Sequence, residues 1–180
     1  RRSSDLTYQD ILSWINDKID QTAVSVEETA LSQSTNWFLD QDNGTIHNQN
    51  NSFFSVVGVK QLVNDEVVAE QPMILQPEIG YLGIIVAEID GVLNFLMQAK
   101  IEPGNINAVQ ISPTIQATKS NFMAKHGGKK PAYLDYFLNA KQHHVIYDQI
   151  QSEQSSRFYR KRNRNIIIKV DDDVEVLDNF

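Results

Sequence analysis

The fold is decided by two apolar runs that flank a turn: Tyr81-Leu82-Gly83-Ile84-Ile85-Val86-Ala87-Glu88, then Asp90-Gly91, then Val92-Leu93-Asn94-Phe95-Leu96-Met97-Gln98-Ala99-Lys100. Asp-Gly between two β-rich runs is a strong short-range signal for a β-hairpin, because both residues tolerate a positive φ. The runs are almost continuously apolar, which is typical of strands covered on both faces. The sequence therefore predicts a buried, central hairpin.

Downstream of the hairpin, residues 109–118 alternate strictly between apolar and polar side chains. This period of two predicts a strand with one apolar face and one polar face. Pro113 has no N–H to donate, so we expect the strand to lie at an edge or to be interrupted there. The uncharged polar face suits sugar hydroxyls, although solvent-facing Ser and Thr are also ordinary in strands; its members are Ser112, Thr114, Gln116 and Thr118.

The remaining segments predict a mixture of helices and strands. Thr7 and Asp10 are spaced as a helix cap, and apolar residues at helical spacing follow from Tyr8 to Ile19. Further elements are a strand end and turn over 37–45, strands over 53–59 and 66–71, a helix behind Pro131 that includes Leu134 and Phe137, its helical continuation through Val145, Ile146 and Ile150, and a final strand over 166–170.

Together these elements predict an α+β fold, with a mixed or antiparallel sheet and flanking helices. We expect a helical segment over residues 1–35 and one globular module over 36–180.

Composition narrows the function classes. The chain has 180 residues and no Cys, which excludes disulfides, thiolate nucleophiles and Cys-based zinc sites. It also has no run of about 18 apolar residues, so we expect a cytoplasmic protein with no membrane partner.

Charge is unevenly distributed along the chain. The net charge is -7, yet residues 119–169 hold eleven Lys or Arg against three Asp or Glu. A polyanionic ligand would bind this basic part. The alternative is that these charges only cover a solvated surface.

The end of the predicted hairpin carries the first candidate for chemistry. Gln98, Lys100 and Glu102 alternate with apolar residues, which places an amide, an ammonium and a carboxylate on one face at steps of about 7 Å. The adjacent turn contains Asn105. Such a group could bind a sugar and move a proton. Alternatively, Lys100 and Glu102 form an exposed ion pair on an edge strand.

The segment Arg157–Arg164 is a second candidate, because guanidinium groups bind phosphate oxygens through paired donors. Its interleaved aromatic residues resemble a nucleic-acid patch in composition only, and the acidic whole chain argues against nucleic acid as a partner. The His residues lie at spacings that do not suit a shared metal, and the sequence has no HExxH, no GxSxG and no Gly-rich phosphate loop, so we expect no metal site.

Five motifs in order resemble the NDP-hexose 2,3-dehydratases: residues 76–80, 96–105, 112–121, 133–137 and 148–165. The resemblance implies a Nudix-like fold, used twice in tandem in each subunit of a homodimer, with this chain as the N-terminal module. It also implies elimination of water from dTDP-4-keto-6-deoxyglucose to give a 3,4-diketo-2,6-dideoxy sugar. The sequence has no Nudix hydrolase box, which argues against Mg²⁺-dependent pyrophosphate hydrolysis.

We therefore form a hypothesis about roles. Glu102 would transfer the proton, Lys100 would stabilise the oxyanion, and Tyr133 or Glu153 would protonate the leaving group, with no cofactor. The substrate would be held by Gln98, Asn105, Gln116, Thr118, Lys119, Asn121, Arg157 and Lys161. The alternative is a non-catalytic sugar-nucleotide-binding or dimerisation module.

Overall fold

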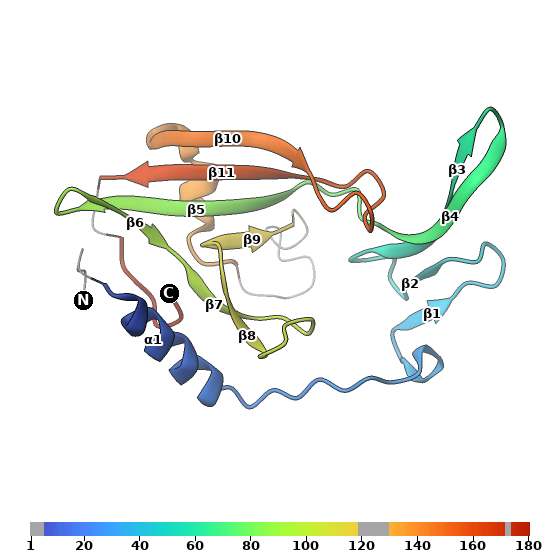
Figure 1. The fold of residues 1–180 in the computed structure, drawn as a ribbon, viewed down its shortest axis with the longest axis horizontal. Helices are drawn as coiled ribbons and strands as arrows, with labels where there is room; N and C mark the ends of the chain where they lie inside the picture. Colours follow the sequence, from blue (N-terminus) through green and yellow to red (C-terminus); the bar gives the residue numbers. More distant parts are fainter. Residues whose placement is uncertain (1–5, 119–129, 172–173) are drawn as a thin grey trace. The chain divides into compact units, whose positions relative to one another are not determined.

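A computed structural model describes residues 6–118, 130–171 and 174–180 of the chain (Figure 1). The described residues combine a few helices with many strands, as an α+β fold requires. They form two compact units. Unit 1 comprises residues 1–26, 80–150 and 164–180, and unit 2 comprises 27–79 and 151–163. The division expected at residue 35/36 stays a prediction.

The central sheet has the strand order β10-β11-β5-β6, and β9 also pairs with β5. Figure 1 shows β10, β11 and β5 as long neighbouring strands. The bounds of the strands are Gly80–Ile89 for β5, Val92–Leu96 for β6, Ile115–Ala117 for β9, His144–Ser152 for β10 and Arg162–Val170 for β11. The short helix α3, Leu134–Leu138, packs on this sheet as predicted behind Pro131.

The core of unit 1 lies between α3 and the sheet. Phe137 of α3 is 1% exposed, and it packs with Ile85 of β5 and Ile168 of β11. Gly83 of β5 allows this close approach, because an added Cβ would lie 2.3 Å from the Phe137 ring. The predicted hairpin turn is confirmed, with Asp90 and Gly91 at φ 51° and 77°.

The prediction that both hairpin strands are covered on both faces is correct for β5 and wrong for β6. All residues of β5 except Glu88 are buried or partly buried, whereas Phe95 of β6 is 52% exposed. The reason is that β6 lies at the edge of the sheet. The second run also does not continue as one strand, since β6 ends at Leu96 and β7 is Gln98–Ile101.

The interruption predicted at Pro113 is confirmed. The alternating segment forms β8, Val109–Ser112, which pairs with β7, and β9, which pairs with β5. Between them, Thr114 is 1% exposed; its hydroxyl donates to the Leu96 carbonyl and accepts from the Ile85 N–H. Thr114 is therefore a buried structural residue rather than a member of a solvent-facing polar face.

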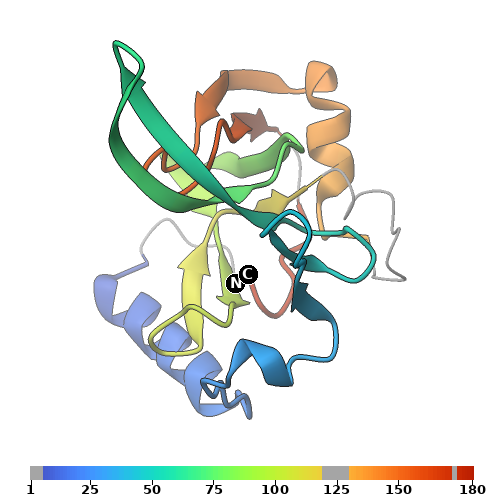
Figure 2. The same ribbon diagram turned by 90° about the vertical axis from the view of Figure 1, so that its right-hand side faces the viewer.

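Unit 2 contains the antiparallel sheet β1-β2-β3-β4. Its strands are Trp37–Leu39, Ile46–Asn48, Ser55–Val63 and Glu66–Leu75, and Figure 2 shows β3 and β4 as a long hairpin. Asn64 and Asp65, both at positive φ, form the turn between β3 and β4. β4 continues through Pro72, beyond the predicted end at Gln71. It can do so because an edge strand tolerates a residue without an N–H.

The helix predicted through Val145, Ile146 and Ile150 is wrong. These residues lie in the strand β10, beside β11. Apolar residues at 145, 146 and 150 fit a helical period, but β-branched side chains also favour a strand when a partner strand is present. The partner, β11, comes more than ten residues later, so a local pattern does not reveal it.

The N-terminal helix α1, Tyr8–Asp20, is confirmed together with its cap. The Thr7 hydroxyl accepts from the Asp10 N–H at 3.2 Å, and the Asp10 carboxylate accepts from the Thr7 N–H at 2.8 Å. α1 packs beside β8, and Lys18 forms an ion pair with Asp178 at 2.7 Å. None of the helices in the described part of the chain is long and apolar enough to cross a membrane.

We expect Gly83→Ala to lower the free energy of unfolding by about 1–3 kcal/mol, because the new methyl group would overlap the Phe137 ring. Urea denaturation followed by circular dichroism measures the loss. Gly58→Ala is the matched control, since Gly58 also lies in a strand but has open space around its Cβ position. An equal loss in both variants would contradict the packing explanation.

Candidate functional site

Three of the predicted site residues meet in unit 1: Lys100, Glu102 and Gln116. The Lys100 ammonium lies 2.6 Å from a Glu102 carboxylate oxygen and donates to the Gln116 carboxamide oxygen at 3.4 Å. The side chain of Lys100 is 24% exposed and that of Glu102 is 46% exposed. The group is thus open to solvent and offers a carboxylate and an amide, each within hydrogen-bonding range of the same cation.

Strand pairing brings these three residues together. Lys100 lies opposite Gln110 in the β7–β8 pair, and Glu102 directly follows β7. Gln116 lies in β9, opposite Leu82 of β5, where the neighbouring residues Ile115 and Ala117 are buried. Gln116 itself is exposed, because side chains alternate along the strand.

Other predicted residues of this unit bond to the main chain. The Gln98 amide donates to the carbonyls of Pro113 and Thr114, at 3.0 and 3.3 Å. The Asn105 amide donates to the carbonyls of Lys100 and Ala108, which holds the turn after β7. Thr118 follows β9 and is half-buried. Lys119 and Asn121 lie outside the described residues.

Tyr133 lies at the start of α3 and contacts the C-terminal residues. Its hydroxyl donates to the Glu175 carbonyl at 2.7 Å and accepts from the Leu177 N–H at 3.1 Å. Burial raises the pKa of the Tyr133 phenol, so the group stays protonated at neutral pH. The Tyr133 hydroxyl can donate its proton to a substrate only if it first loses its hydrogen bond to the Glu175 carbonyl.

Glu153, Arg157 and Lys161 lie in unit 2. A Glu153 carboxylate oxygen accepts from the Asn163 amide at 2.6 Å. The Lys161 ammonium donates to the Glu78 carbonyl, and Lys161 is only 5% exposed. Burial lowers the pKa of this amine. Arg157 is exposed, so of the two cations it is the one open to a ligand.

The basic segment also contains Arg164, which lies in unit 1. Its guanidinium forms paired bonds to the Asp148 carboxylate, at 2.7 and 2.5 Å, and donates to the Tyr81 hydroxyl at 2.9 Å. Arg164 holds the pKa of the Asp148 carboxyl below its usual value. This guanidinium therefore already has a carboxylate partner where a phosphate would bind.

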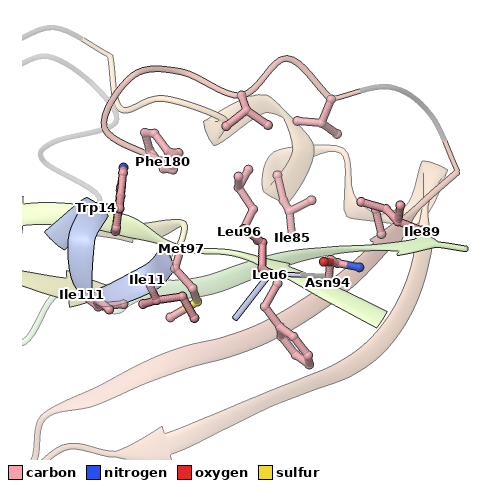
Figure 3. Close-up of a pocket in the computed structure, with 14 residues that line it drawn as sticks. Leu6, Ile11, Trp14, Ile85, Ile89, Asn94, Leu96, Met97, Ile111 and Phe180 are labelled. Atoms are coloured by element: carbon pink, nitrogen blue, oxygen red, sulfur yellow. The ribbon is translucent and has the colours of Figure 1, made fainter. Parts of the chain in front are cut away.

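A cavity of about 620 Å³ lies in unit 1, between α1, β5, β6 and the C-terminal residues (Figure 3). Apart from the Asn94 carboxamide and the indole N–H of Trp14, its lining side chains are apolar; Met97 and Phe180 are among them. A sugar diphosphate requires many hydrogen bonds and compensating cations, which this lining does not offer. Lys100, Glu102 and Gln116 are not among the residues that line this cavity.

No cluster of three or more His, Asp or Glu side chains suited to a metal occurs among the described residues. The chemistry available at Lys100, Glu102 and Gln116 is proton transfer and stabilisation of negative charge on oxygen.

Comparison with known proteins places the chain in a family. The family model described as NDP-hexose 2,3-dehydratase matches residues 8–180. A protein of Saccharopolyspora spinosa, named dTDP-4-dehydro-6-deoxy-alpha-D-glucopyranose 2,3-dehydratase, is 42% identical over 169 residues. A protein of Amycolatopsis orientalis with the same name is 40% identical over 179 residues. The chain belongs to the NDP-hexose 2,3-dehydratase family.

The matches cover most of this chain but a smaller part of the relatives. They span 93% of the chain and 35% of the Saccharopolyspora protein, and 96% of the chain and 38% of the Amycolatopsis protein. The chain thus corresponds to little more than a third of each relative.

Sequence reasoning missed two features of the site region. It gave no role to Asn163, whose amide positions Glu153, and it did not pair Asp148 with Arg164. Asp148 lies in β10 and Glu153 directly follows this strand, whereas Asn163 and Arg164 both lie in β11. A predicted hairpin at 144–170 would have indicated both pairs, but the helical interpretation of 145–150 hid them.

We expect Lys161→Ala to lower the free energy of unfolding by about 1–3 kcal/mol, because it leaves the Glu78 carbonyl without its donor. Arg157→Ala is the matched control and should change stability by less than about 0.5 kcal/mol, since Arg157 is exposed. Chemical denaturation of both variants measures the difference. Equal effects would contradict a structural role for Lys161.

Proposed function

We propose that the chain is an NDP-hexose 2,3-dehydratase, or half of one, that eliminates water from dTDP-4-keto-6-deoxyglucose. The observation that carries the proposal is the family match over residues 8–180, with relatives about 40% identical that are named for a dTDP-linked substrate. The relatives are longer than this chain, so their activity and substrate are part of the proposal.

The reaction requires a base, an oxyanion stabiliser and an acid. The C4 ketone acidifies the C3 hydrogen, and removal of that proton gives an enolate. The enolate expels the C2 hydroxyl, which leaves as water after protonation. The resulting enol tautomerises to a 3,4-diketo-2,6-dideoxy sugar. No electrons are exchanged with another molecule, so proton transfer and charge stabilisation suffice and no redox cofactor is needed.

Lys100 and Glu102 supply two of these three functions. A C4 oxygen bound at the Lys100 ammonium would share the cation with Glu102, and the carboxylate 2.6 Å away would accept the C3 proton. Gln116, bonded to Lys100, and Thr118 would orient the hexose. Tyr133 and Glu153 remain the two candidates for the leaving-group acid. Lys119 and Asn121 stay predicted substrate ligands.

The finer architecture belongs to the same proposal. We propose a Nudix-like module, used twice in tandem in a homodimer. The α+β composition and the share of each relative that the chain covers, 35% and 38%, support a single module of a duplicated protein.

A specific observation favours a second candidate, a sugar-nucleotide-binding module without catalytic activity. Lys100 and Glu102 neutralise each other in an ion pair, and the Tyr133 hydroxyl is bonded to the Glu175 carbonyl. Each group would have to change partners before reacting. Binding requires fewer such changes than catalysis.

We expect Glu102→Gln to lower kcat about 10²- to 10⁴-fold, because the amide cannot accept the C3 proton. A product assay with dTDP-4-keto-6-deoxyglucose measures the change. Glu88→Gln is the matched control, since Glu88 also forms a 2.6 Å ion pair, with Lys169, in the same unit. An unchanged kcat in Glu102→Gln would show that Glu102 is not the base.

Calorimetric titration of the chain with dTDP, alongside the product assay, separates the two candidate functions. A catalytic module binds dTDP and converts the keto sugar. A binding module gives the same heat of binding but forms no product. If the chain binds no dTDP, both candidates are wrong.

A further inference from the structure

Unit 2 presents a cluster of three aromatic side chains: Trp37 of β1, and Phe53 and Phe54 in the segment that precedes β3. The Trp37 ring lies 4.7 Å from the Phe54 ring and 6.4 Å from the Phe53 ring, and the planes of Trp37 and Phe53 are within 29° of parallel. Phe53 is 54% exposed and Phe54 is 38% exposed. We call these three residues the aromatic platform.

One residue of the aromatic platform, Phe53, has an unfavourable backbone conformation. Phe53 has φ +70°, which is rare for a bulky side chain and costs on the order of 1–3 kcal/mol. The buried Asn48 stabilises the loop before it, because its carboxamide oxygen accepts from the Asn50 N–H at 3.1 Å and the Ser52 hydroxyl at 2.9 Å. Phe53 is about half exposed, so burial of its side chain offsets only part of this cost.

The loop that precedes Phe53 in the chain is polar. The loop residues Gln49, Asn50 and Asn51 are exposed and lie next to it in the chain. Carboxamides both donate and accept hydrogen bonds, which matches the alternating donors and acceptors on the edge of a pyrimidine base. Aromatic faces bind nucleobases by stacking. The combination suits a flat polar ring better than an aliphatic chain.

Strand register places the platform near an exposed cation. Phe54 lies two residues before Val56, Val56 pairs with Ile74, and the Ile74 N–H donates to the Arg157 carbonyl at 2.8 Å. With strands about 4.8 Å apart and a rise of about 3.3 Å per residue, the backbones of Phe54 and Arg157 lie roughly 12 Å apart. A nucleoside diphosphate can span this separation, with its base on the aromatic platform and its phosphates at Arg157.

We propose that the aromatic platform binds the base of a pyrimidine nucleoside diphosphate. This inference rests on the proposed function, because that function supplies the nucleotide. It assigns the base to Phe53 and Trp37 and the diphosphate to Arg157, all within unit 2. No residue of this platform was among the expected substrate ligands.

Fluorescence tests the proposal directly, because Trp14 and Trp37 are the only two tryptophans of the chain. Trp14 lies in unit 1. In the Trp14→Phe variant, Trp37 is the remaining tryptophan and is the source of all tryptophan emission. We expect dTDP to quench this emission with the same saturation curve as the heat measured by calorimetry. Binding heat without a change in emission would overturn the base-binding site and leave the proposed function standing.

Calorimetry on Phe53→Leu provides the second test, with an expected loss of dTDP affinity of about tenfold or more. Phe38→Leu is the matched control. Phe38 is 43% exposed in the same strand as Trp37, but it packs against His47 at 4.4 Å and points to the other face of the sheet. The dTDP affinity of the Phe38→Leu variant should be unchanged.

The outcomes distinguish the two proposals. Equal dTDP affinities for Phe53→Leu and the unaltered chain, or equal losses in Phe53→Leu and Phe38→Leu, would overturn the aromatic platform. Absence of dTDP binding to the unaltered chain would overturn the proposed function and the platform with it. If Phe53→Leu fails to fold, as seen by circular dichroism, the Trp37 emission decides.

Discussion

The rest of unit 1 depends on two hydrogen bonds made by the buried hydroxyl of Thr114. It donates to the carbonyl of Leu96, the last residue of β6, and accepts from the N–H of Ile85 in β5. Main-chain groups that would otherwise lie unpaired in a dry interior are thereby satisfied. Beside these two hydrogen bonds, the chain leaves the central sheet after β6 and enters it again at β9. Between these two points, β7 and β8 pair with each other.

This departure from the sheet creates the polar group at Lys100. Lys100 lies in β7 of the two-stranded sheet, and Gln116 lies in β9, which pairs with β5 of the central sheet. β7 brings the Lys100 ammonium to within 3.4 Å of the Gln116 carboxamide, and Glu102 directly follows this strand. The three side chains stand at the surface, whereas Phe137 and Ile168 fill the interior behind the sheet. A rigid, apolar core thus supports a small set of groups suited to proton transfer.

Unit 2 has a different chemical character. Its Lys161 and Asn163 are buried and tied to neighbouring groups, while Arg157 and the aromatic rings of Phe53 and Phe54 face solvent. Stacking surfaces and exposed guanidinium groups bind nucleotides, and carboxylate–ammonium pairs suit reactions at a ketone. Unit 1 thus carries a carboxylate–ammonium pair, and unit 2 carries exposed aromatic rings and an exposed guanidinium group.

The sequence by itself determined the features that depend on neighbouring residues: the Asp90-Gly91 turn, the cap of Thr7 and Asp10, the break at Pro113 and the family motifs. It also named Lys100, Glu102 and Gln116, which the strands bring together. Only the tertiary structure decided that residues 145–150 form a strand, that β6 is exposed and that Lys161 is buried against Glu78. The physical reason is that strand pairing, burial and the partner of each charge depend on residues distant in the chain, which local periodicity does not record.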